Sequence, residues 1–331
     1  MKDYDFIAIG DMTTDAFVRL FPDSAEVVRD KHPKLCLGYG DKIPFEKAYV
    51  IAGVGNSANA AVAASRLGLR AALVTHTGND YHGQEMLKKL KAEKIDTAFV
   101  TVNENMISNY HYVLWYKDDR TILIKHEPYV YHLPELPQKS WIYFSSVGES
   151  ALAIHQELAD FLAQNPDTRL AFQPGTFQIR LGAGKLASLY RRTHLFISNR
   201  EEAQLILKTK NDDLEHLAKG IRALGPRLVV ITDGVAGSYT YDENRLWFMP
   251  PYPDPKPPLE RTGAGDAFSS TFASVLALGK SVEDAMTWAP INAMSVVQYV
   301  GAQEGLLDQE ALTRLLKKAP RDYRPKLLKE F

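Results

Sequence analysis

The stretch RTGAGDAFSSTFASVLALG, residues 261–279, combines small residues, one acid and an apolar run with helical spacing. Gly263, Ala264 and Gly265 would let the backbone turn tightly and approach a ligand, because none of them has a bulky side chain. Their N–H groups would lie at the N-terminus of the helix that follows. Unsatisfied donors and the positive end of the helix dipole favour an anion there, and phosphate is the ligand we expect.

Asp266 follows these small residues directly and would repel a phosphate unless it had a task of its own. A general base for a hydroxyl that attacks the phosphate is such a task, because phosphoryl transfer needs positioning, charge stabilisation and a proton acceptor. The pattern also fits a plainer alternative, in which Asp266 is a helix-start acid and the glycines form only a turn. Asp266 is thus a candidate catalytic base beside a candidate anion hole.

Alternating strand and helix patterns predict the scaffold that would position these residues. DFIAIGD, residues 5–11, is a short apolar run stopped by Gly-Asp, as in a buried strand, and residues 83–95 have the apolar spacing of an amphipathic helix. Further strand candidates lie at 71–78, 141–146, 169–172, 194–198 and 227–234. This rhythm predicts an α/β fold with a mainly parallel central sheet covered by helices.

Two segments break the rhythm. Residues 109–127 contain two β-rich runs around a Lys-Asp-Asp-Arg turn, and residues 14–50 are irregular with several candidate strands. We expect antiparallel strands that form a small β-sheet lid, with aromatic residues that either pack the lid onto the core or contact a ligand. The predicted core comprises 1–13, 52–106 and 128–331, and the predicted lid comprises 14–51 and 107–127.

The composition restricts the function classes. With 331 residues, 45% of them hydrophobic, the chain can bury a large core. Its 39 basic and 40 acidic residues form no long run of one sign, so we expect neither nucleic acid nor a membrane surface as a partner. The single cysteine, Cys36, cannot form an internal disulfide, and no segment approaches about 18 consecutive apolar residues. We expect a cytoplasmic protein that binds small molecules.

Four motifs resemble one known family. TGAGDAF (262–268) with its apolar helix resembles the C-terminal signature of the PfkB, or ribokinase-like, family of sugar and nucleoside kinases. GDMTTD (10–15) and GVGNSANAAVAASRLG (53–68) are similar to the two N-terminal motifs of the family, and SNREEA (198–203) to its Asn-x-x-Glu motif. The resemblance runs in the order of the family's motifs from Asp5 to about Gly305.

The resemblance implies a ribokinase-like three-layer sandwich with a small β-sheet lid. It implies a transferase that moves the γ-phosphate of ATP to a hydroxyl of a sugar or nucleoside. Asp266 would be the base, and Gly263, Ala264 and Gly265 the anion hole. The aromatic-rich lid slightly favours a nucleoside, because a base offers a ring on which side chains can stack.

The resemblance also implies roles for residues outside the TGAGD stretch. Substrate hydroxyls would be bound by Asp15, Gly55 and Asn59. Mg²⁺ would be organised by Asn199 and Glu202, largely through water. The implied ATP contacts are Asn199, Thr232, Gly234, Gly237 and Asn292. Without the family, Asn199 and Glu202 are adequately explained as a helix N-cap and its capping-box partner.

Two properties of relatives stay open at this point. Relatives often dimerise through their lids, so a homodimer through an apolar outer lid face is one expectation. A monovalent cation such as K⁺ is the other; here Glu260 stands where the family often has an aspartate. Residues 172–180, FQPGTFQIR, replace the Asp-x-Asn-x-Arg pattern of several sugar-acid kinases, which disfavours that substrate class.

Two other functions compete with the kinase. GVGNSA, residues 53–58, matches the G-x-G-x-x-A pattern of an NAD-dependent oxidoreductase, but Thr75 and His76 stand where the ribose-binding acid should be. A non-catalytic member that senses a sugar or nucleotide is the second alternative, and the presence of Asp266 argues against it. A P-loop is excluded at 181–186, because Leu186 follows the lysine in place of Ser or Thr.

Overall fold

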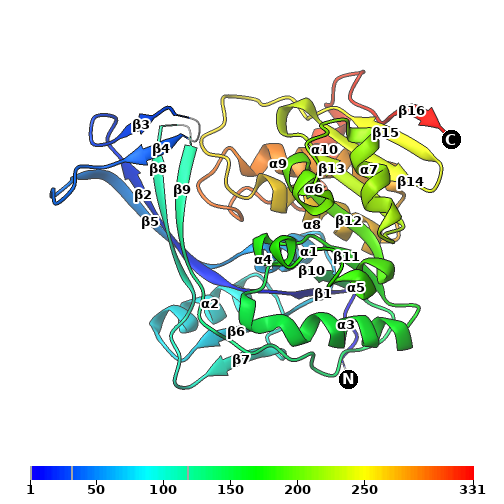
Figure 1. Ribbon diagram of the computed structural model, residues 1–331, viewed down its shortest axis with the longest axis horizontal. Coiled ribbons are helices and arrows are strands. Elements are labelled where there is room, and N and C mark those ends of the chain that lie inside the picture. Colours follow the sequence, from blue (N-terminus) through cyan, green and yellow to red (C-terminus); the bar gives the residue numbers. More distant parts are fainter. Residues whose placement is uncertain (1, 31–32, 118) are drawn as a thin grey trace.

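A large sheet forms the centre of the computed structural model, which describes residues 2–30, 33–117 and 119–331 (Figure 1). In spatial order its ten described strands are β16 (Lys326–Glu330), β15 (Arg245–Met249), β14 (Ser238–Asp242), β13 (Leu228–Thr232), β12 (Thr193–Asn199), β11 (Arg169–Phe172), β10 (Trp141–Phe144), β1 (Phe6–Ile9), β6 (Ala71–Gly78) and β7 (Val100–Asn103). The strands from β13 to β7 pair in parallel, and β14, β15 and β16 extend the sheet with antiparallel pairing. The predicted α/β fold with a mainly parallel sheet is confirmed.

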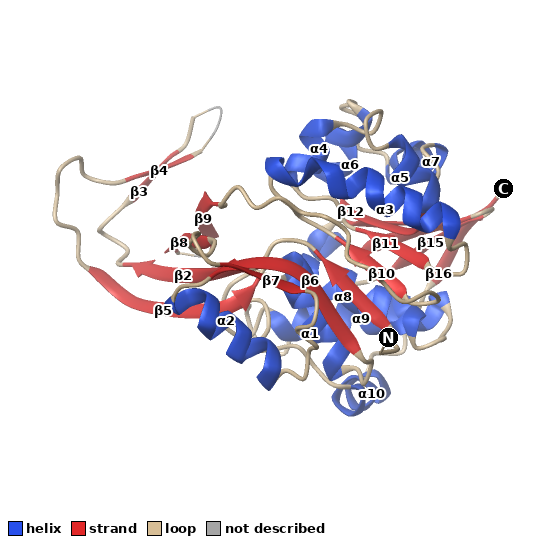
Figure 2. Cartoon of the chain, turned by 90° about the horizontal axis from the view of Figure 1, so that it is seen from below, coloured by secondary structure: helices blue, strands red, loops and turns tan. Residues whose placement is uncertain are grey.

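Helices cover both faces of this sheet and make a three-layer sandwich (Figure 2). One face carries α1 (Asn56–Arg66), α2 (Tyr81–Ala92), α8 (Ala264–Ala277), α9 (Val282–Val296) and α10 (Gln309–Lys317). The other carries α3 (Leu152–Gln164), α4 (Thr176–Leu181), α5 (Ala187–Arg192), α6 (Arg200–Leu207) and α7 (Leu214–Ala223). Two short 3₁₀ turns are η1 (Glu149–Ala151) and η2 (Gly234–Ala236). None of the helices in the described ranges is long and apolar enough to cross a membrane.

The adjacent strands β1 and β10 are apolar and buried along their whole length because both faces of the sheet are covered. In β1, Phe6 and Ala8 belong to the core beneath α1 and α8, while Ile7 and Ile9 belong to the core beneath α3. All four are completely buried. This alternation, with a period of two residues, lets one strand serve two hydrophobic cores.

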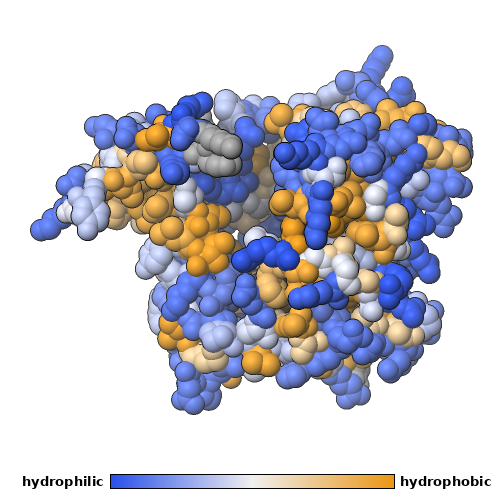
Figure 3. All heavy atoms as spheres, viewed as in Figure 1, coloured by the Kyte–Doolittle hydropathy of each residue, from blue (hydrophilic) through white to orange (hydrophobic). Residues whose placement is uncertain are grey.

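A second sheet forms the lid, which stands to one side of the core (Figure 1). Its strand order is β5 (Phe45–Val54), β2 (Thr13–Leu20), β8 (Tyr110–Tyr116) and β9 (Asp119–Lys125), and a hairpin of β3 (Glu26–Val28) and β4 (Lys34–Cys36) extends the lid. Figure 3 shows a hollow between the lid and the core. The small separate sheet was predicted, and its strands β2 and β5 extend a few residues beyond the predicted lid segments.

The strand directions in the lid differ in part from the prediction. The pairs β2–β5 and β8–β9 are antiparallel as expected, but β2 and β8 pair in parallel. The expectation of antiparallel pairing is wrong for this pair because β2 follows β1 and β8 follows β7. Both lid strands therefore leave the core from the carboxyl ends of strands of the same parallel sheet, in which only β6 separates β1 from β7, and they run in the same direction.

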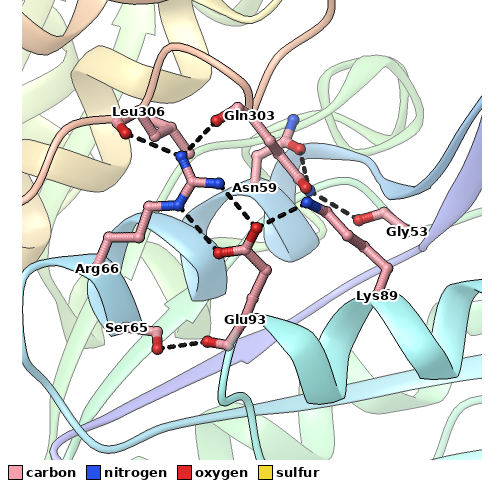
Figure 4. A network of polar contacts seen from close by, with 8 residues as sticks. All are labelled: Gly53, Asn59, Ser65, Arg66, Lys89, Glu93, Gln303 and Leu306. Atoms are coloured by element: carbon pink, nitrogen blue, oxygen red, sulfur yellow. Dashed lines mark hydrogen bonds and ion pairs between the residues drawn. The ribbon is translucent and has the colours of Figure 1, made fainter.

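An ion-pair cluster of Arg66, Lys89 and Glu93, called the Arg66 cluster below, joins α1 to the end of α2 (Figure 4). Arg66 Nη2 and Nε donate to the two carboxylate oxygens of Glu93 at 2.7 and 3.0 Å, and Lys89 Nζ lies 2.7 Å from Glu93 Oε1. Burial raises the pKa of Glu93, but the hydrogen bonds and charges of Arg66 and Lys89 outweigh it and lower the pKa to about 2. The ionised form of Glu93 is therefore the one that stabilises the fold.

This shift predicts a pH-dependent contribution to stability. Because the pKa of Glu93 falls from 4.5 to about 2 on folding, its stabilisation is complete above pH 4.5 and is lost as the pH falls toward 2. We expect Glu93→Gln to lower the free energy of unfolding at pH 7 by on the order of 2 kcal/mol. Urea denaturation between pH 7 and pH 3 should show this difference shrinking below pH 4.5. A difference that stays constant would contradict the expectation; Glu85→Gln, on the exposed face of α2, is the control.

Candidate active site

A cleft of about 380 Å³ lies between the lid and the carboxyl ends of the central strands. Parallel sheets commonly bind ligands at this edge, because the loops and helix N-termini that follow the strands meet there. Its core side is lined by Asp11 after β1, Ser146 after β10, Gln173 after β11, Asn199 at the end of β12 and Thr232 at the end of β13. The central sheet thus supplies the floor of the site.

The predicted turn before the apolar helix is present. Gly263 caps α8 with a φ of 80°, in the left-handed region that favours glycine. The first backbone hydrogen bond of the helix runs from Ala267 N–H to Gly263 O at 2.7 Å, so the N–H groups of Ala264, Gly265 and Asp266 have no partner in the preceding turn. Gly263, Gly265 and Asp266 line the cleft, which gives an anion access to these donors.

Asp266, in the first turn of α8, is held by two side-chain amides. Asn59 Nδ2 donates to Asp266 Oδ2 at 2.9 Å, and Gln173 Nε2 donates to Oδ1 at 3.3 Å. Burial raises the pKa of Asp266, while these two hydrogen bonds act in the opposite direction. The carboxylate is therefore oriented at both oxygens and has a raised proton affinity, which suits a general base.

The three predicted substrate residues all line the cleft. Asp15 on β2 stands opposite His111 on β8, with 3.3 Å between Oδ1 and Nδ1. Gly55 caps α1 with a φ of 116°, and a Cβ at this position would lie 2.8 Å from the carbonyl oxygen of Asp11. Asn59 is buried in α1 and reaches both the cleft and Asp266. Asp15, Gly55 and Asn59 thus line the same cleft as Asp266, and Asn59 contacts its carboxylate directly.

The sequence analysis missed a row of lid residues that also line the cleft. They are Arg120, Ile122, Ile124 and His126. They alternate along β9 and its end, so the period of two residues in a strand was a usable signal. The Nε atom of Arg120 is buried without a hydrogen-bond partner, and His126 Nδ1 lies 2.8 Å from Asp11 Oδ2. The lid therefore presents one cation and two apolar side chains to the cleft.

A second, mostly apolar chamber of about 340 Å³ adjoins the cleft. It is lined by the predicted residues Thr232, Gly234 and Gly237, and by Met249, Tyr252, Phe268, Pro290 and Met294 among others. Thr232, Arg261 and Gly265 line both spaces, so the turn before α8 stands where the chambers meet. An apolar chamber that opens onto helix N–H groups suits a ligand with a planar base and a phosphate chain.

Asn199 and Glu202 form a capping box at the start of α6. Glu202 N–H donates to Asn199 Oδ1 at 2.8 Å, and Asn199 N–H donates to Glu202 Oε2 at 3.0 Å. Burial raises the pKa of Glu202, and the negative charge of Asp266 acts in the same direction. Both residues also line the cleft. Their oxygens fit Mg²⁺ held through water, since Mg²⁺ keeps several of its waters; across the described ranges no three His, Cys, Asp or Glu side chains form a direct metal site.

Asn292, an expected ATP contact, is not among the residues that line the apolar chamber. The residue is completely buried in α9. Its Nδ2 donates to Thr271 Oγ1 at 2.7 Å, and its Oδ1 accepts from Leu307 N–H at 2.9 Å. Asn292 therefore joins α8, α9 and the loop before α10, and its neighbours Ala293 and Met294 line the chamber instead.

Glu260 serves as a structural anchor. One carboxylate oxygen accepts from Thr262 N–H at 2.6 Å and the other from Gly301 N–H at 2.9 Å. The residue is buried and ties the turn before α8 to the loop at 301. Because both oxygens already accept backbone N–H groups, this arrangement does not favour a monovalent cation at Glu260.

The fold and the cleft together define a ribokinase-like kinase, and comparison with known proteins agrees. The chain belongs to the pfkB family of carbohydrate kinases, whose sequence model matches residues 39–309. It is therefore a phosphotransferase with an alcohol group as acceptor. Family membership confirms the resemblance inferred from the sequence and argues against the oxidoreductase alternative.

Individual relatives cover almost the whole chain. The ribokinase of Bacillus subtilis (strain 168) is 27% identical over 298 residues, which cover 88% of this chain and 94% of the relative. A nucleoside kinase of Methanothermobacter thermautotrophicus is 24% identical, over 95% of this chain and 96% of the relative. The structure of Arabidopsis thaliana ribokinase complexed with ribose and ATP matches with a TM-score of 0.77 at 19% identity, over 96% of this chain and 99% of that chain.

The turn before α8 leads to a stability test. A Cβ added at Gly263 would lie 2.4 Å from the Cβ of Ala302. The substituted residue would also have to adopt a φ of 80°. We expect Gly263→Ala to lower the free energy of unfolding by about 2 kcal/mol, measured by urea denaturation. Gly265→Ala is the matched control, since no atom lies within 4 Å of its added Cβ. Equal losses in the two variants would show that the contact with Ala302 does not require glycine.

Proposed function

We propose that this protein is an ATP-dependent kinase that transfers the γ-phosphate to a hydroxyl group of a sugar. The observation that carries the proposal is the position of Asp266. Asp266 lines the polar cleft in the first turn of α8, directly after Gly265, which lines both the cleft and the apolar chamber. An acceptor in the cleft and a nucleotide in the chamber would therefore meet at this carboxylate.

In the proposed reaction, Asp15 and Asn59 hold hydroxyl groups of the acceptor. The oxygen of the acceptor hydroxyl attacks the γ-phosphorus, and the bond between that phosphorus and the leaving oxygen of ADP breaks. Asp266 takes the proton that the hydroxyl loses. The N–H groups of Ala264, Gly265 and Asp266 stabilise the charge that develops on the phosphoryl oxygens. The helix N-terminus supports this role because its donors need no reorganisation during the reaction.

Positive charge around the phosphates would come from two directions. Arg120 from the lid and Arg261 from the loop before α8 both line the cleft. Glu202 and Asn199 would hold Mg²⁺ through water, where the cation would neutralise charge on the β- and γ-phosphates. Closure of the lid would exclude water, which otherwise competes with the sugar as acceptor.

The nucleotide would occupy the apolar chamber. Thr232, Gly234 and Gly237 line it, and the two glycines have positive φ values of 53° and 103°. Backbone in this conformation brings the chain close to a ligand without a side chain in between. Phe268 and Tyr252 supply aromatic surface for a base in the same chamber.

The lining of the cleft favours a sugar over a nucleoside as acceptor. The lid aromatics suggested a nucleoside, but Tyr110 and Tyr112 contact one another, and Trp115 and Tyr116 are buried within the lid. Within the described ranges, no Phe, Tyr or Trp side chain lines the cleft. Polar groups and the flat apolar surface of Ile122 and Ile124 suit a hydroxyl-rich ring.

The base assignment has a direct test. Asp266→Asn should keep its affinity for ATP and lose roughly 10²- to 10⁴-fold in kcat, because the amide cannot take the proton. The measurement is ADP release from Mg-ATP with ribose, fructose, fructose 6-phosphate, adenosine, inosine, guanosine and cytidine. Asp284→Asn is the matched control, since Asp284 is also a first-turn helix acid but caps α9.

Each outcome of this panel decides between functions. Turnover with a sugar that is lost in Asp266→Asn and kept in Asp284→Asn supports the proposal. Equal effects of the two substitutions would mean that Asp266 is only a helix-start acid. A silent panel with retained ATP binding would favour a non-catalytic sensor, and binding of NAD in place of ATP would overturn the kinase.

We also propose that two copies of the chain associate through their lids. Val50, Tyr112 and Leu123 lie in one row on β5, β8 and β9, and each is more than half exposed. This row is on the face opposite the cleft-lining His111 and Ile124, because successive residues of a strand alternate. An apolar row of this kind on an open sheet is typical of an interface.

Light scattering after gel filtration tests the interface. The wild-type protein should have twice the 37.1 kDa mass of one chain, and Leu123→Lys should shift it to the monomer mass, because the charge would be buried unpaired. Val130→Lys changes an equally exposed apolar residue outside the lid strands and should leave the dimer intact. A monomeric wild-type protein would contradict the proposal.

A further inference from the structure

The two side-chain amides that donate to Asp266, from Asn59 and Gln173, each accept a hydrogen bond from another residue. Gln303 is buried, and its Nε2 donates to Asn59 Oδ1 at 2.9 Å and to Gly53 O at 2.7 Å (Figure 4). On the other side of the carboxylate, the hydroxyl of Tyr143 donates to Gln173 Oε1. Each amide thus accepts a hydrogen bond at its oxygen and donates to Asp266 through its nitrogen.

The donor from Gln303 determines which way the Asn59 amide faces, and the hydroxyl of Tyr143, which can donate or accept, stabilises the orientation of Gln173 in which the amide nitrogen donates to Asp266. A side-chain amide has its donor and its acceptor on different atoms, so occupying the oxygen with a donor directs the nitrogen elsewhere. If the Asn59 amide were reversed, its oxygen would face the carboxylate of Asp266 and its nitrogen would face Gln303 Nε2. Both contacts would be repulsive, since they would place two acceptors or two donors together.

We propose that Gln303 and Tyr143 are positioning residues of the phosphoryl transfer, which orient the amides of Asn59 and Gln173 so that both donate to Asp266. This inference rests on the proposed function, in which Asp266 is the base. Neither residue needs to touch the substrate or the nucleotide. Each acts through the amide next to it, and Asp266 receives a hydrogen bond at each oxygen as a result.

Gln303 is fixed through its backbone as well as its side chain. Arg66 Nη1 donates to the carbonyl oxygens of Gln303 at 2.7 Å and Leu306 at 2.8 Å (Figure 4). The Arg66 cluster holds this guanidinium in place through Glu93. Hydrogen bonds to charged donors are stronger than neutral ones, so the loop at 303–306 is firmly attached to α1.

The groups around Asp266 shift its pKa in opposite directions, and the two amides are among those that lower it. Asp15 raises the pKa of Asp266 and Arg120 lowers it, while Glu202 and Tyr143 face it from β12–α6 and β10. Burial raises the pKa further, and the hydrogen bond from Asn59 is the largest opposing influence. Loss of an amide donor should therefore raise the pKa of Asp266.

The sign of the kinetic effect follows directly. A protonated Asp266 cannot accept the proton of the acceptor hydroxyl, so kcat falls on the acid side of its pKa. A higher pKa moves this acid limb toward neutral pH. Variants that misdirect an amide should thus lose most activity at low pH and regain it as the pH rises.

The experiment compares Gln303→Met and Tyr143→Phe, which remove the orienting donors with little change of volume, with the wild type. We expect kcat at pH 7 to fall roughly 10- to 100-fold, which is the change in rate that corresponds to the loss of one hydrogen bond to a charged group. The acid limb of kcat should move to higher pH in both variants, and KM should change little in Tyr143→Phe, because its partner Gln173 is not one of the residues that hold acceptor hydroxyls. Gln309→Met is the control, since Gln309 bonds Leu67 O at the start of α10 and does not contact Asn59.

A second readout does not require turnover. The pKa of Asp266 can be followed by carbon NMR of ¹³C-carboxyl-labelled aspartate, with Asp266→Asn to assign the signal. It should be higher in Gln303→Met and Tyr143→Phe than in the wild type and Gln309→Met. An unchanged pKa in both variants overturns the inference. If Gln303→Met does not fold, Tyr143→Phe decides.

The two proposals can fail separately. A wild type that phosphorylates no acceptor would overturn the proposed function, while a raised pKa in the two variants would still establish how the amides are oriented. Normal turnover with an unmoved acid limb and an unmoved pKa would leave the kinase intact and remove Gln303 and Tyr143 from the mechanism. A purely structural role would lower stability without moving the acid limb.

Discussion

The hydrogen bonds from Asn59 and Gln173 to Asp266 are the interaction on which the rest of the site depends. Burial raises the pKa of this carboxylate and so favours its protonated form. The two amides compensate by donating to both oxygens. They come from α1 and from the loop after β11, so the packing of α1 beside α8 and the register of the central sheet place the two donors that lower the pKa of Asp266.

The turn at Gly263 divides the site into two environments. On one side lie polar residues and the lid; on the other lies an apolar chamber. A single glycine with positive φ, pressed against Ala302, brings the free N–H groups of α8 to the place where these environments meet. The lid completes the polar side by alternation along β9, which turns Arg120, Ile122 and Ile124 toward the core.

Much of the scaffold could be predicted because its signals are local. Apolar runs that end in Gly or Asp mark the parallel strands, and small residues before a helical apolar run mark the turn before α8. The parallel pairing of β2 and β8 could not be read in this way, since it depends on which edge of the core each strand leaves. The contacts of Asn292 could not be read locally either, since its partners Thr271 and Leu307 are set by how α8 and α9 pack.

The sequence by itself determined the family, the α/β architecture and the residue types that do chemistry, because short motifs carry that information in their spacing. Only the tertiary structure decided how those residues support one another. Asn59 lies 207 positions from Asp266, and Gln303 lies 244 positions from Asn59. Contacts across such separations exist only after the strands and helices have packed, since no local pattern specifies which donor will face which acceptor.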